Sequence, residues 1–394
     1  MTDLKHYRDP RNPGGPLIPR SDWDAAPFNR WAFQNVRQMV PTAEVWRGPG
    51  PVMPLPEAPQ NLMELPFEAD GEHLTIGGFL EDSYTDGFLV LSKGAAVVEV
   101  YMNGMQRRTT HLSQSVAKSV VGTVAAILNG RGELDFAAPV TDYLPELERT
   151  AYRGATVQQV MDMTSGVLFD ETYTAPDSHI AKVDRACGWK DLVPGWPETM
   201  WQLISELTEF EAAHGESFRY RSIETDVIGF ILQRISGLML HDLVSRELWA
   251  PMGAEEDAYF TVDRAGYGLA DGGFNATLRD YGRFGQLIAN GGTAHGRQIV
   301  PWRFIEDLPN GNHANFGRDY RIALPGGAYH NQFWIEEAGK PVVMCRGVFG
   351  QLIYVDREAD FVAVKLSTWP DFTNVRRTRT ALAAIRALRA ALGA

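Results

Sequence analysis

The sequence has little cysteine, no paired histidines and no excess of basic charge. Only two cysteines, Cys187 and Cys345, occur among 394 residues, which excludes a disulfide framework or a cysteine-based metal site. The nine histidines are scattered singly, without an HExxH motif, so we expect no metal and no organic cofactor. The formal net charge of −12 argues against nucleic-acid partners, because they require a basic surface.

Long apolar runs are missing as well. No stretch approaches the roughly 18 apolar residues that a membrane span needs, and the polar residues 1–15 lack the apolar core of a signal peptide. We therefore expect a soluble cytoplasmic protein with a small-molecule substrate and no membrane partner. The oligomeric state stays open, with a homodimer as one candidate.

Two common catalytic signatures are absent too. No serine lies in the GxSxG turn of the α/β-hydrolases, and no GxxxxGK phosphate-binding loop occurs. The composition is that of an ordinary globular protein, with 44% hydrophobic and 22% charged residues, which is enough for a sizeable core.

The order of the elements predicts an α/β (α+β) fold. Residues 1–65 are rich in proline and tryptophan and indicate an extended arm with a short helix at 29–39. Residues 66–394 are expected to form one domain, in which 66–130 and 256–394 build an antiparallel sheet flanked by helices, and 131–255 form an inserted, mainly helical part. The pattern predicts a hairpin at 88–101 with its turn at Lys93-Gly94, helices at 115–129, 225–235, 277–291 and 375–392, and strands at 332–336, 341–345, 351–355 and 361–366.

Ser115 and Lys118 form the strongest candidate for a chemical site. They are the two ends of the chain's only S-x-x-K, and residues three apart on a helix are neighbours. The helix that follows Ser115 is apolar on nearly every face, and such an environment disfavours the charged form of a lysine. We expect a lowered pKa for Lys118, so that a neutral amine accepts the serine proton. The alternative is a solvated serine with a surface lysine.

Tyr220 is the candidate for a second proton carrier. It lies in Tyr220-Arg221-Ser222, just before the predicted helix at 225–235. A lysine ammonium beside a phenol stabilises the phenolate, so we expect a lowered pKa for Tyr220. An ordinary half-buried tyrosine is the alternative.

Several of these segments together resemble the penicillin-recognising, β-lactamase-like superfamily of serine hydrolases. SVAK opening a buried helix is followed by NGRGELDFAAPVTDYLPEL and TVQQVMDMTSGV, then by YRS with DVIGFILQRISGLMLHDLV, and by GGFNATLRDYGRFGQLIANGG. The Y-x-S element is similar to that of class C enzymes, family VIII carboxylesterases and 6-aminohexanoate-dimer (nylon oligomer) hydrolases. The segments PFNRWAF at 27–33 and 170–176 are most similar to the last group.

The resemblance implies further site residues. In the nylon-oligomer hydrolases, the positions that match Tyr173, Asp184 and Trp189 line the substrate cleft; the aspartate faces the substrate's ammonium, and the tyrosine donates to the scissile nitrogen. A backbone N–H of Val348 would form an oxyanion hole with that of Ser115. Each of the three cleft residues also has a plain structural alternative, as a helix cap, a loop aromatic or a core tryptophan.

Two positions depart from the superfamily's pattern. Cys345-Arg346-Gly347 stands where Lys or His, Thr or Ser, and Gly are usual, which puts β-lactam hydrolysis in doubt. Cys345 would border the substrate as a reactive thiol, with an ordinary buried cysteine as the alternative, and Asp271 stands where an asparagine is usual in the nylon-oligomer hydrolases.

The sequence thus predicts a serine hydrolase that cleaves short linear amides or esters through an acyl-enzyme, with 6-aminohexanoate-type amides first. A family VIII-type carboxylesterase and a non-catalytic binding protein of the same fold are the alternatives.

Overall fold

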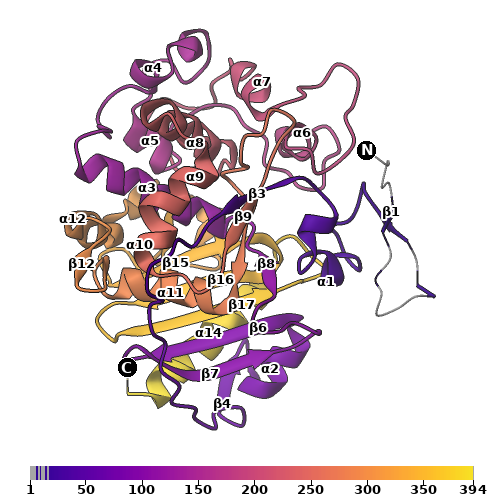
Figure 1. Ribbon diagram of the computed structural model, residues 1–394, viewed down its shortest axis with the longest axis vertical. Helices are drawn as coiled ribbons and strands as arrows, with labels where there is room; N and C mark the ends of the chain where they lie inside the picture. Colours follow the sequence, from indigo (N-terminus) through magenta and orange to yellow (C-terminus); the bar gives the residue numbers. More distant parts are fainter. Residues whose placement is uncertain (1–5, 8, 10–13, 16, 394) are drawn as a thin grey trace.

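The centre of the fold is a seven-stranded antiparallel sheet in the order β13-β14-β15-β16-β17-β6-β7 (Figure 1). The computed structural model describes residues 6–7, 9, 14–15 and 17–393. The strands are β6 (Thr85–Ser92), β7 (Ala95–Tyr101), β13 (Ala328–His330), β14 (Phe333–Ile335), β15 (Val342–Gly347), β16 (Gln351–Asp356) and β17 (Phe361–Ser367). Because β17 pairs with β6, with Ala363 opposite Val90, distant parts of the chain meet in one sheet. The expected antiparallel sheet from both ends of the chain is confirmed.

The hairpin of β6 and β7 turns at the predicted dipeptide. Lys93 and Gly94 have φ angles of 51° and 74°. Two consecutive positive φ angles are typical of the tight hairpin turn that matches the twist of the strands.

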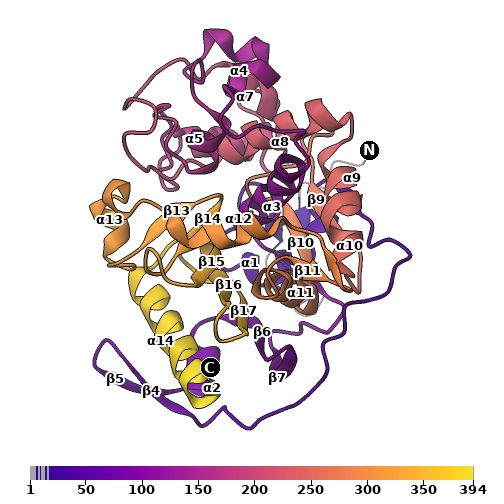
Figure 2. The same cartoon turned by 90° about the vertical axis from the view of Figure 1, so that its left-hand side faces the viewer.

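Helices cover both faces of the sheet. Leu89 and Leu91 belong to the same core cluster as α11 (Leu278–Ala289), whereas Phe88 and Val90 belong to the cluster of α14 (Val375–Ala391). This alternation follows from the two-residue period of a strand. Figure 2 shows α11 and α14 on opposite sides of the strands.

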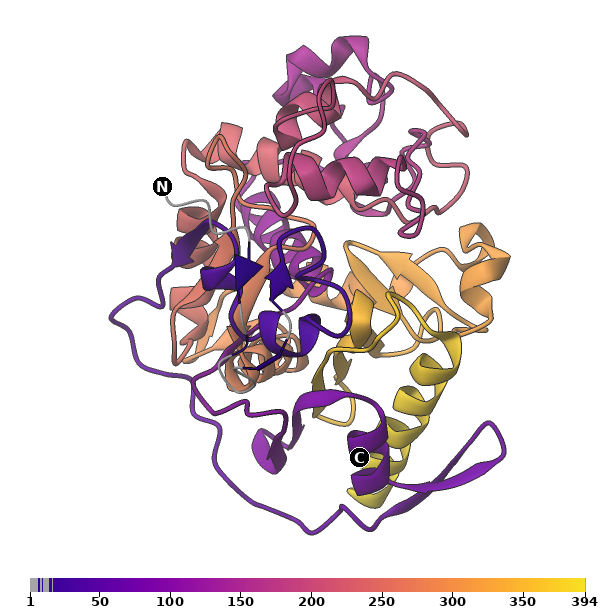
Figure 3. The same ribbon diagram turned by 90° about the vertical axis from the view of Figure 1, so that its right-hand side faces the viewer.

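The helical part lies above the sheet in the views of Figures 1 and 3. Its α-helices are α4 (Val140–Tyr143), α5 (Val157–Met161), α6 (His179–Ala186), α7 (Met200–Ser205), α8 (Ile223–Ser236), α9 (Leu240–Val244) and α10 (Ala250–Met252). The helix α3 (Val116–Gly130) packs against α8 and β15 and is buried on every side from Val116 to Leu128. A helix enclosed in this way holds its first turn in a fixed place.

The remaining elements are short. The other α-helices are α1 (Asn29–Ala32), α2 (Ile76–Asp82), α12 (Trp302–Asp307) and α13 (Arg318–Arg321). Single turns of 3-10 helix lie at Val36–Gln38, Pro145–Arg149, Leu308–Asn310, His313–Asn315 and Val348–Gly350, and a π-helical turn at Ser245–Trp249. In the described part of the chain no single helix is long and apolar enough to cross a membrane; the bent pair Ile223–Ser236 and Leu240–Met252 meets the length and composition criteria only when taken together.

A second, four-stranded sheet was not predicted. Its order is β3-β9-β10-β8, formed by β3 (Thr42–Val45), β9 (Ala258–Thr261), β10 (Phe274–Thr277) and β8 (Thr110–Leu112). Three two-stranded ribbons complete the strands: β1 (His6–Tyr7) with β2 (Ile18–Pro19), β4 (Pro66–Ala69) with β5 (Glu72–Thr75), and β11 (Thr293–Ala294) with β12 (Arg297–Gln298). Because β8 leads directly into α3, the small sheet fixes the approach to Ser115.

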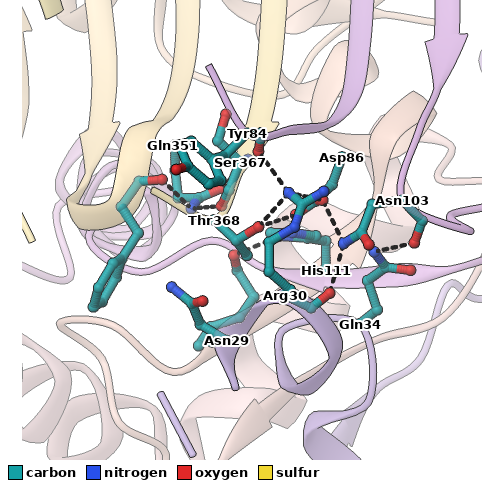
Figure 4. A network of polar contacts seen from close by, with 12 residues as sticks. Asn29, Arg30, Gln34, Tyr84, Asp86, Asn103, His111, Gln351, Ser367 and Thr368 are labelled. Atoms are coloured by element: carbon teal, nitrogen blue, oxygen red, sulfur yellow. Dashed lines mark hydrogen bonds and ion pairs between the residues drawn. The ribbon is translucent and has the colours of Figure 1, made fainter. Parts of the chain in front are cut away.

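The N-terminal segment is anchored to the body through Asp86, a buried residue of β6 (Figure 4). Its Oδ1 accepts hydrogen bonds from Arg30 Nη1 at 2.9 Å and Asn103 Nδ2 at 2.7 Å. Its Oδ2 lies 3.0 Å from His111 Nε2 and accepts from Thr368 Oγ1 at 2.9 Å. A buried carboxylate with four partners is well compensated, and one of those partners belongs to the arm.

The helix expected at 29–39 is shorter than predicted. The turn α1 ends at Ala32, and a separate 3-10 turn begins at Val36. Between them Asn35 Nδ2 donates to the carbonyl of Trp31 at 2.8 Å, and this local bond competes with continued helix. Part of the proline-rich stretch before residue 17 lies outside the described residues.

Candidate active site

Ser115 and Lys118 meet at the first turn of α3. Ser115 is the residue just before the helix, and Lys118 Nζ donates to Ser115 Oγ at 2.9 Å. The same Nζ donates to Ser222 Oγ at 3.2 Å and to the carbonyl of Asp271 at 2.6 Å. Three acceptors match the three N–H bonds of an ammonium, so the geometry fits a charged Lys118.

The charge of Lys118 contradicts one expectation from the sequence. Burial does favour the neutral amine, but the negative charges of Tyr220, Asp271 and Glu171 outweigh it and raise the pKa of Lys118 above its usual value. The predicted fall in the Lys118 pKa was therefore wrong. The apolar helix was visible in the sequence, whereas the acids around the amine come from other segments.

Tyr220 completes this cluster from the loop before α8. Its ring centroid lies 5.2 Å from Lys118 Nζ. Burial raises the pKa of Tyr220, although the Lys118 charge and hydrogen bonding with Ser115 oppose the rise. The predicted lowering was wrong because the desolvation of the phenol outweighs the effect of the Lys118 charge. The Ser115 hydroxyl, which accepts from Lys118, has Tyr220 as a partner for its own proton.

Glu171 was missed in the sequence and lies at the centre of the hydrogen bonds behind this cluster. Its carboxylate accepts from the Ser222 N–H at 2.9 Å, from Ser222 Oγ at 2.6 Å and from the Tyr173 hydroxyl at 2.8 Å. A continuous chain therefore runs from Lys118 through Ser222 to Glu171 and Tyr173. The signal available was the position of Glu171 two residues before Tyr173, in a segment already singled out.

The end of β15 lies against the loop that carries Ser115. A Cβ built on Gly347 would lie 2.5 Å from the carbonyl oxygen of Ser113 and 3.0 Å from the amide nitrogen of Ser115. Any side chain here would push the strand away, so the close approach requires glycine. Val348 follows directly and lines the same space as Ser115.

Two cavities meet at Ser115. The first, which we call the acidic cavity, has a volume of about 50 Å³, and its lining includes Asp24, Asp184 and Asp271. The second, the large cavity, has a volume of about 430 Å³. Both are lined by Ser115, Tyr173, Val348 and Phe372. A linear substrate could thus extend to both sides of the nucleophile.

The acidic cavity contains the other predicted cleft residues. Asp184 Oδ2 lies 2.6 Å from Lys190 Nζ, which is also 3.6 Å from Asp24 Oδ1. Trp189 donates through Nε1 to Thr261 Oγ1 at 3.0 Å and forms part of the wall. Burial, reinforced by the charge of Asp184, raises the pKa of Asp24 to about 6.

Asp24 itself was not predicted, because its place depends on how the arm folds back.

Burial also raises the pKa of Asp271 to about 6. The three acids of this cavity, Asp24, Asp184 and Asp271, outnumber the two cations beside them, Lys190 and Lys118, so the cavity suits a positively charged ligand group.

Cys345 lies apart from the predicted cleft residues. It is buried on β15, its thiol pKa is raised to about 12 by burial, and it lines neither cavity. Its neighbour Arg346 lines the large cavity instead, because successive residues of a strand face opposite sides.

The comparisons with known proteins agree with this architecture. The beta-lactamase family model matches residues 80–388. A 6-aminohexanoate-dimer hydrolase from Paenarthrobacter ureafaciens is 36% identical over 353 residues, which is 89% of this chain and 88% of the relative.

Solved structures show the same fold. The structure titled putative 6-aminohexanoate-dimer hydrolase from Bacillus anthracis has a TM-score of 0.87 at 28% identity and covers 98% of this chain and 99% of that one. A family VIII carboxylesterase has a TM-score of 0.58 at 16% identity, covering 78% and 96%, which shows the fold alone. From its family match and its relatives, the chain belongs to the beta-lactamase family and is a serine hydrolase.

Proposed function

We propose that the protein hydrolyses short linear amides of the 6-aminohexanoate type through an acyl-enzyme on Ser115. The observation that carries the proposal is the contact of Lys118 Nζ with Ser115 Oγ at the point where the two cavities meet. The name of the 36% identical relative, a 6-aminohexanoate-dimer hydrolase, supports the substrate class.

Tyr220 and Lys118 have separate roles in this mechanism. Tyr220 as phenolate takes the Ser115 proton while Oγ bonds to the amide carbon, and the Lys118 ammonium stabilises that phenolate. Tyr220 then gives the proton to the nitrogen as the C–N bond breaks. The same tyrosine deprotonates the water that releases the acid and regenerates the serine.

The oxyanion of the tetrahedral intermediate requires donors beside Ser115. We assign this role to the backbone N–H groups of Ser115 and Val348, because Gly347 lets the end of β15 approach the nucleophile loop. Donors fixed in place before the reaction stabilise the developing charge.

The substrate's ammonium is assigned to the acidic cavity. Asp184 and Asp24 lie there with Lys190, and Trp189 forms part of the wall. The half of the substrate that carries the ammonium is the acyl half, so the leaving amine lies in the large cavity. Tyr220 lines that cavity too.

A fluorophosphonate probe followed by mass spectrometry tests the nucleophile. We expect labelling of Ser115, none in Ser115→Ala, and unchanged labelling in Ser119→Ala, a serine of the same helix that lines neither cavity. An unlabelled Ser115 in correctly folded protein would instead support a binding protein of the same fold.

A carboxylesterase is the second candidate. The large cavity favours it, since Trp334, Leu352 and Leu382 give it an apolar lining suited to an ester's alkyl group. Side-by-side turnover of a 6-aminohexanoate dimer, p-nitrophenyl acetate and nitrocefin decides between them. Turnover of the ester alone would reverse the order of the two candidates.

A further inference from the structure

Arg346 is a cation in the large cavity that the mechanism does not use. Its guanidinium lies 4.9 Å from the ring centroid of Trp334, and Nη2 donates to Thr378 Oγ1 at 3.4 Å. Within the part of the chain that the structure describes, no carboxylate forms an ion pair with it. The side chain is half-buried, so a positive charge lies in the cavity wall without a carboxylate beside it, and only the Tyr220 phenolate formed in the mechanism favours that charge.

An unpaired guanidinium at such a place is costly for the empty enzyme. Burial lowers the pKa of Arg346 to about 10, which reflects the loss of solvent around the charge. A bound carboxylate would return the lost stabilisation, because a guanidinium presents two parallel N–H donors to two oxygens. Contact with the Trp334 ring restricts the guanidinium before a ligand arrives.

The other charged residues that line the large cavity are not placed to bind a ligand carboxylate. Glu171 accepts hydrogen bonds from Ser222 and Tyr173, and Asp319 is an exposed acid at the rim. Lys365, the other cation of the lining, is fully buried and donates to the carbonyl of Ser83 at 3.2 Å. Arg346 is thus the cation placed to meet a ligand.

The two cavities therefore present different charged groups on the two sides of Ser115. The acidic cavity has Asp24, Asp184 and Asp271, and the large cavity has Arg346. The lining of the large cavity also includes Tyr220, Trp334, Leu352 and Leu382, whose apolar surfaces suit a chain of methylene groups. A linear amide with an ammonium at its acyl end and a carboxylate at its amine end matches this order.

We propose that Arg346 binds the carboxylate of the leaving half, so that the enzyme selects linear amides whose amine product is an ω-amino acid. This inference rests on the proposed function, because it assigns the leaving half to the large cavity. It adds a specificity-determining residue in the strand beside the nucleophile.

The test compares two substrates, the 6-aminohexanoate dimer and the same dimer with its carboxylate converted to a primary amide. We expect wild-type kcat/KM to favour the free carboxylate by about tenfold or more, as a charge-assisted pair would give. Arg346→Met, which keeps length and removes charge, should bring that ratio close to one. Most of the change should appear in KM.

The ratio cancels any general damage to the enzyme. Arg318→Met removes the same charge from an exposed site that lines neither cavity, and it should keep the wild-type ratio. A wild-type ratio near one, or an Arg346→Met ratio like that of wild type, would overturn the inference.

A second measurement separates this inference from the proposed function. Hexanoate and hexanamide are compared as protectants of Ser115 against the fluorophosphonate probe. Better protection by hexanoate in wild type, lost in Arg346→Met, supports the anion site even if the dimer is not turned over. Equal protection by both compounds in wild type contradicts it.

Discussion

Lys190 Nζ lies 2.6 Å from Asp184 Oδ2, so the carboxylate expected to meet a substrate ammonium already has a cation beside it. Asp24 is within 3.6 Å of the same nitrogen. A substrate's ammonium thus enters an existing cluster of charges, with two acids around one lysine. The strength of substrate binding therefore depends on how much of the negative charge of Asp24 and Asp184 is already neutralised by Lys190.

Asp184→Asn is expected to raise KM for an ammonium-bearing amide by about threefold to tenfold, because a charge-assisted hydrogen bond becomes a neutral one. The measurement is the ratio of kcat/KM for the aminohexanoate dimer to that for p-nitrophenyl acetate, which carries no ammonium. Asp191→Asn, at an exposed acid nearby, is the control. A ratio unchanged by Asp184→Asn would leave this residue a purely structural role with Lys190.

Lys118→Ala and Tyr220→Phe are each expected to lower kcat by about a thousandfold or more, and the double variant should be scarcely slower than the slower single one. Residues that act on one proton as a unit are strongly non-additive. Steady-state kinetics of the three variants, with circular dichroism to check folding, decide the point. If the rate loss of the double variant equalled the product of the two single losses, Tyr220 would position the substrate and take no proton.

Activity should rise with pH through the alkaline range. Burial raises the pKa of Tyr220, whose deprotonated form is the base, while the neighbouring acids raise the pKa of Lys118 and keep it charged. The base form therefore grows as pH increases, and Lys118 stays protonated across the same range. A plateau of kcat/KM reached below about pH 8 would contradict this assignment.

Tyr173→Phe should lower the ratio of amide to ester turnover by about tenfold, or 1.4 kcal/mol of transition-state stabilisation. An amide nitrogen must receive its proton from Tyr220 before it leaves, and a hydrogen bond from the Tyr173 hydroxyl would hold that nitrogen in place for the transfer, whereas an ester's alkoxide needs less help. The Tyr173 hydroxyl now donates to Glu171, so its proton must be redirected in the reacting complex. Equal losses on the dimer and on p-nitrophenyl acetate would make Tyr173 a support for Glu171 alone.

His330 links the helical part to the sheet and gives a pH-dependent contribution to stability. Its Nδ1 lies 2.8 Å from Asp162 and its Nε2 2.8 Å from Asp307. These carboxylates overcome burial and raise the pKa of His330 to about 9. Since the folded pKa exceeds the unfolded value, the contribution is complete below about pH 6.5 and is lost as pH rises through 9.

His330→Gln should therefore cost on the order of 2–3 kcal/mol in the free energy of unfolding at pH 6, and much less at pH 9.5. Urea unfolding at the two pH values measures this. His73→Gln, at an exposed histidine beside Glu68, is the control and should have little effect at either pH. A loss independent of pH would show that His330 acts by packing.

The elements with strong periodicity could be predicted from the sequence, and the rest depended on the tertiary fold. The helices α3 and α14 and the hairpin of β6 and β7 have long, regular patterns. The strands of the small sheet have only three or four residues each, and β9 and β10 are buried at every position, so no alternation marks them.

In the candidate site, too, the local features could be predicted from the sequence and those that depend on the tertiary fold could not. The spacing of Ser115 and Lys118 is local, and a helix turns it into a contact. The charge state of Lys118 depends on acids remote in sequence, and local reasoning gave it the wrong sign. Cys345 and Arg346 are neighbours on β15 and point to opposite faces of the sheet. The sequence alone does not show which of the two faces the cavity, because this depends on how the strand is placed in the sheet.

The arrangement of the sheet also determines when the enzyme can become active during synthesis. The walls of the cavities include Asp24 and Val348, and β6 lies between β7, which follows it directly, and β17, which comes near the end of the chain. A ribosome that has completed the nucleophile helix has therefore made neither β15, the strand that bears Arg346, nor β17, the second partner of β6. Such long-range pairing is slow to form and leaves strand edges exposed until the partner emerges. Ser115 can thus acquire its reactive surroundings only when almost the whole polypeptide has been translated.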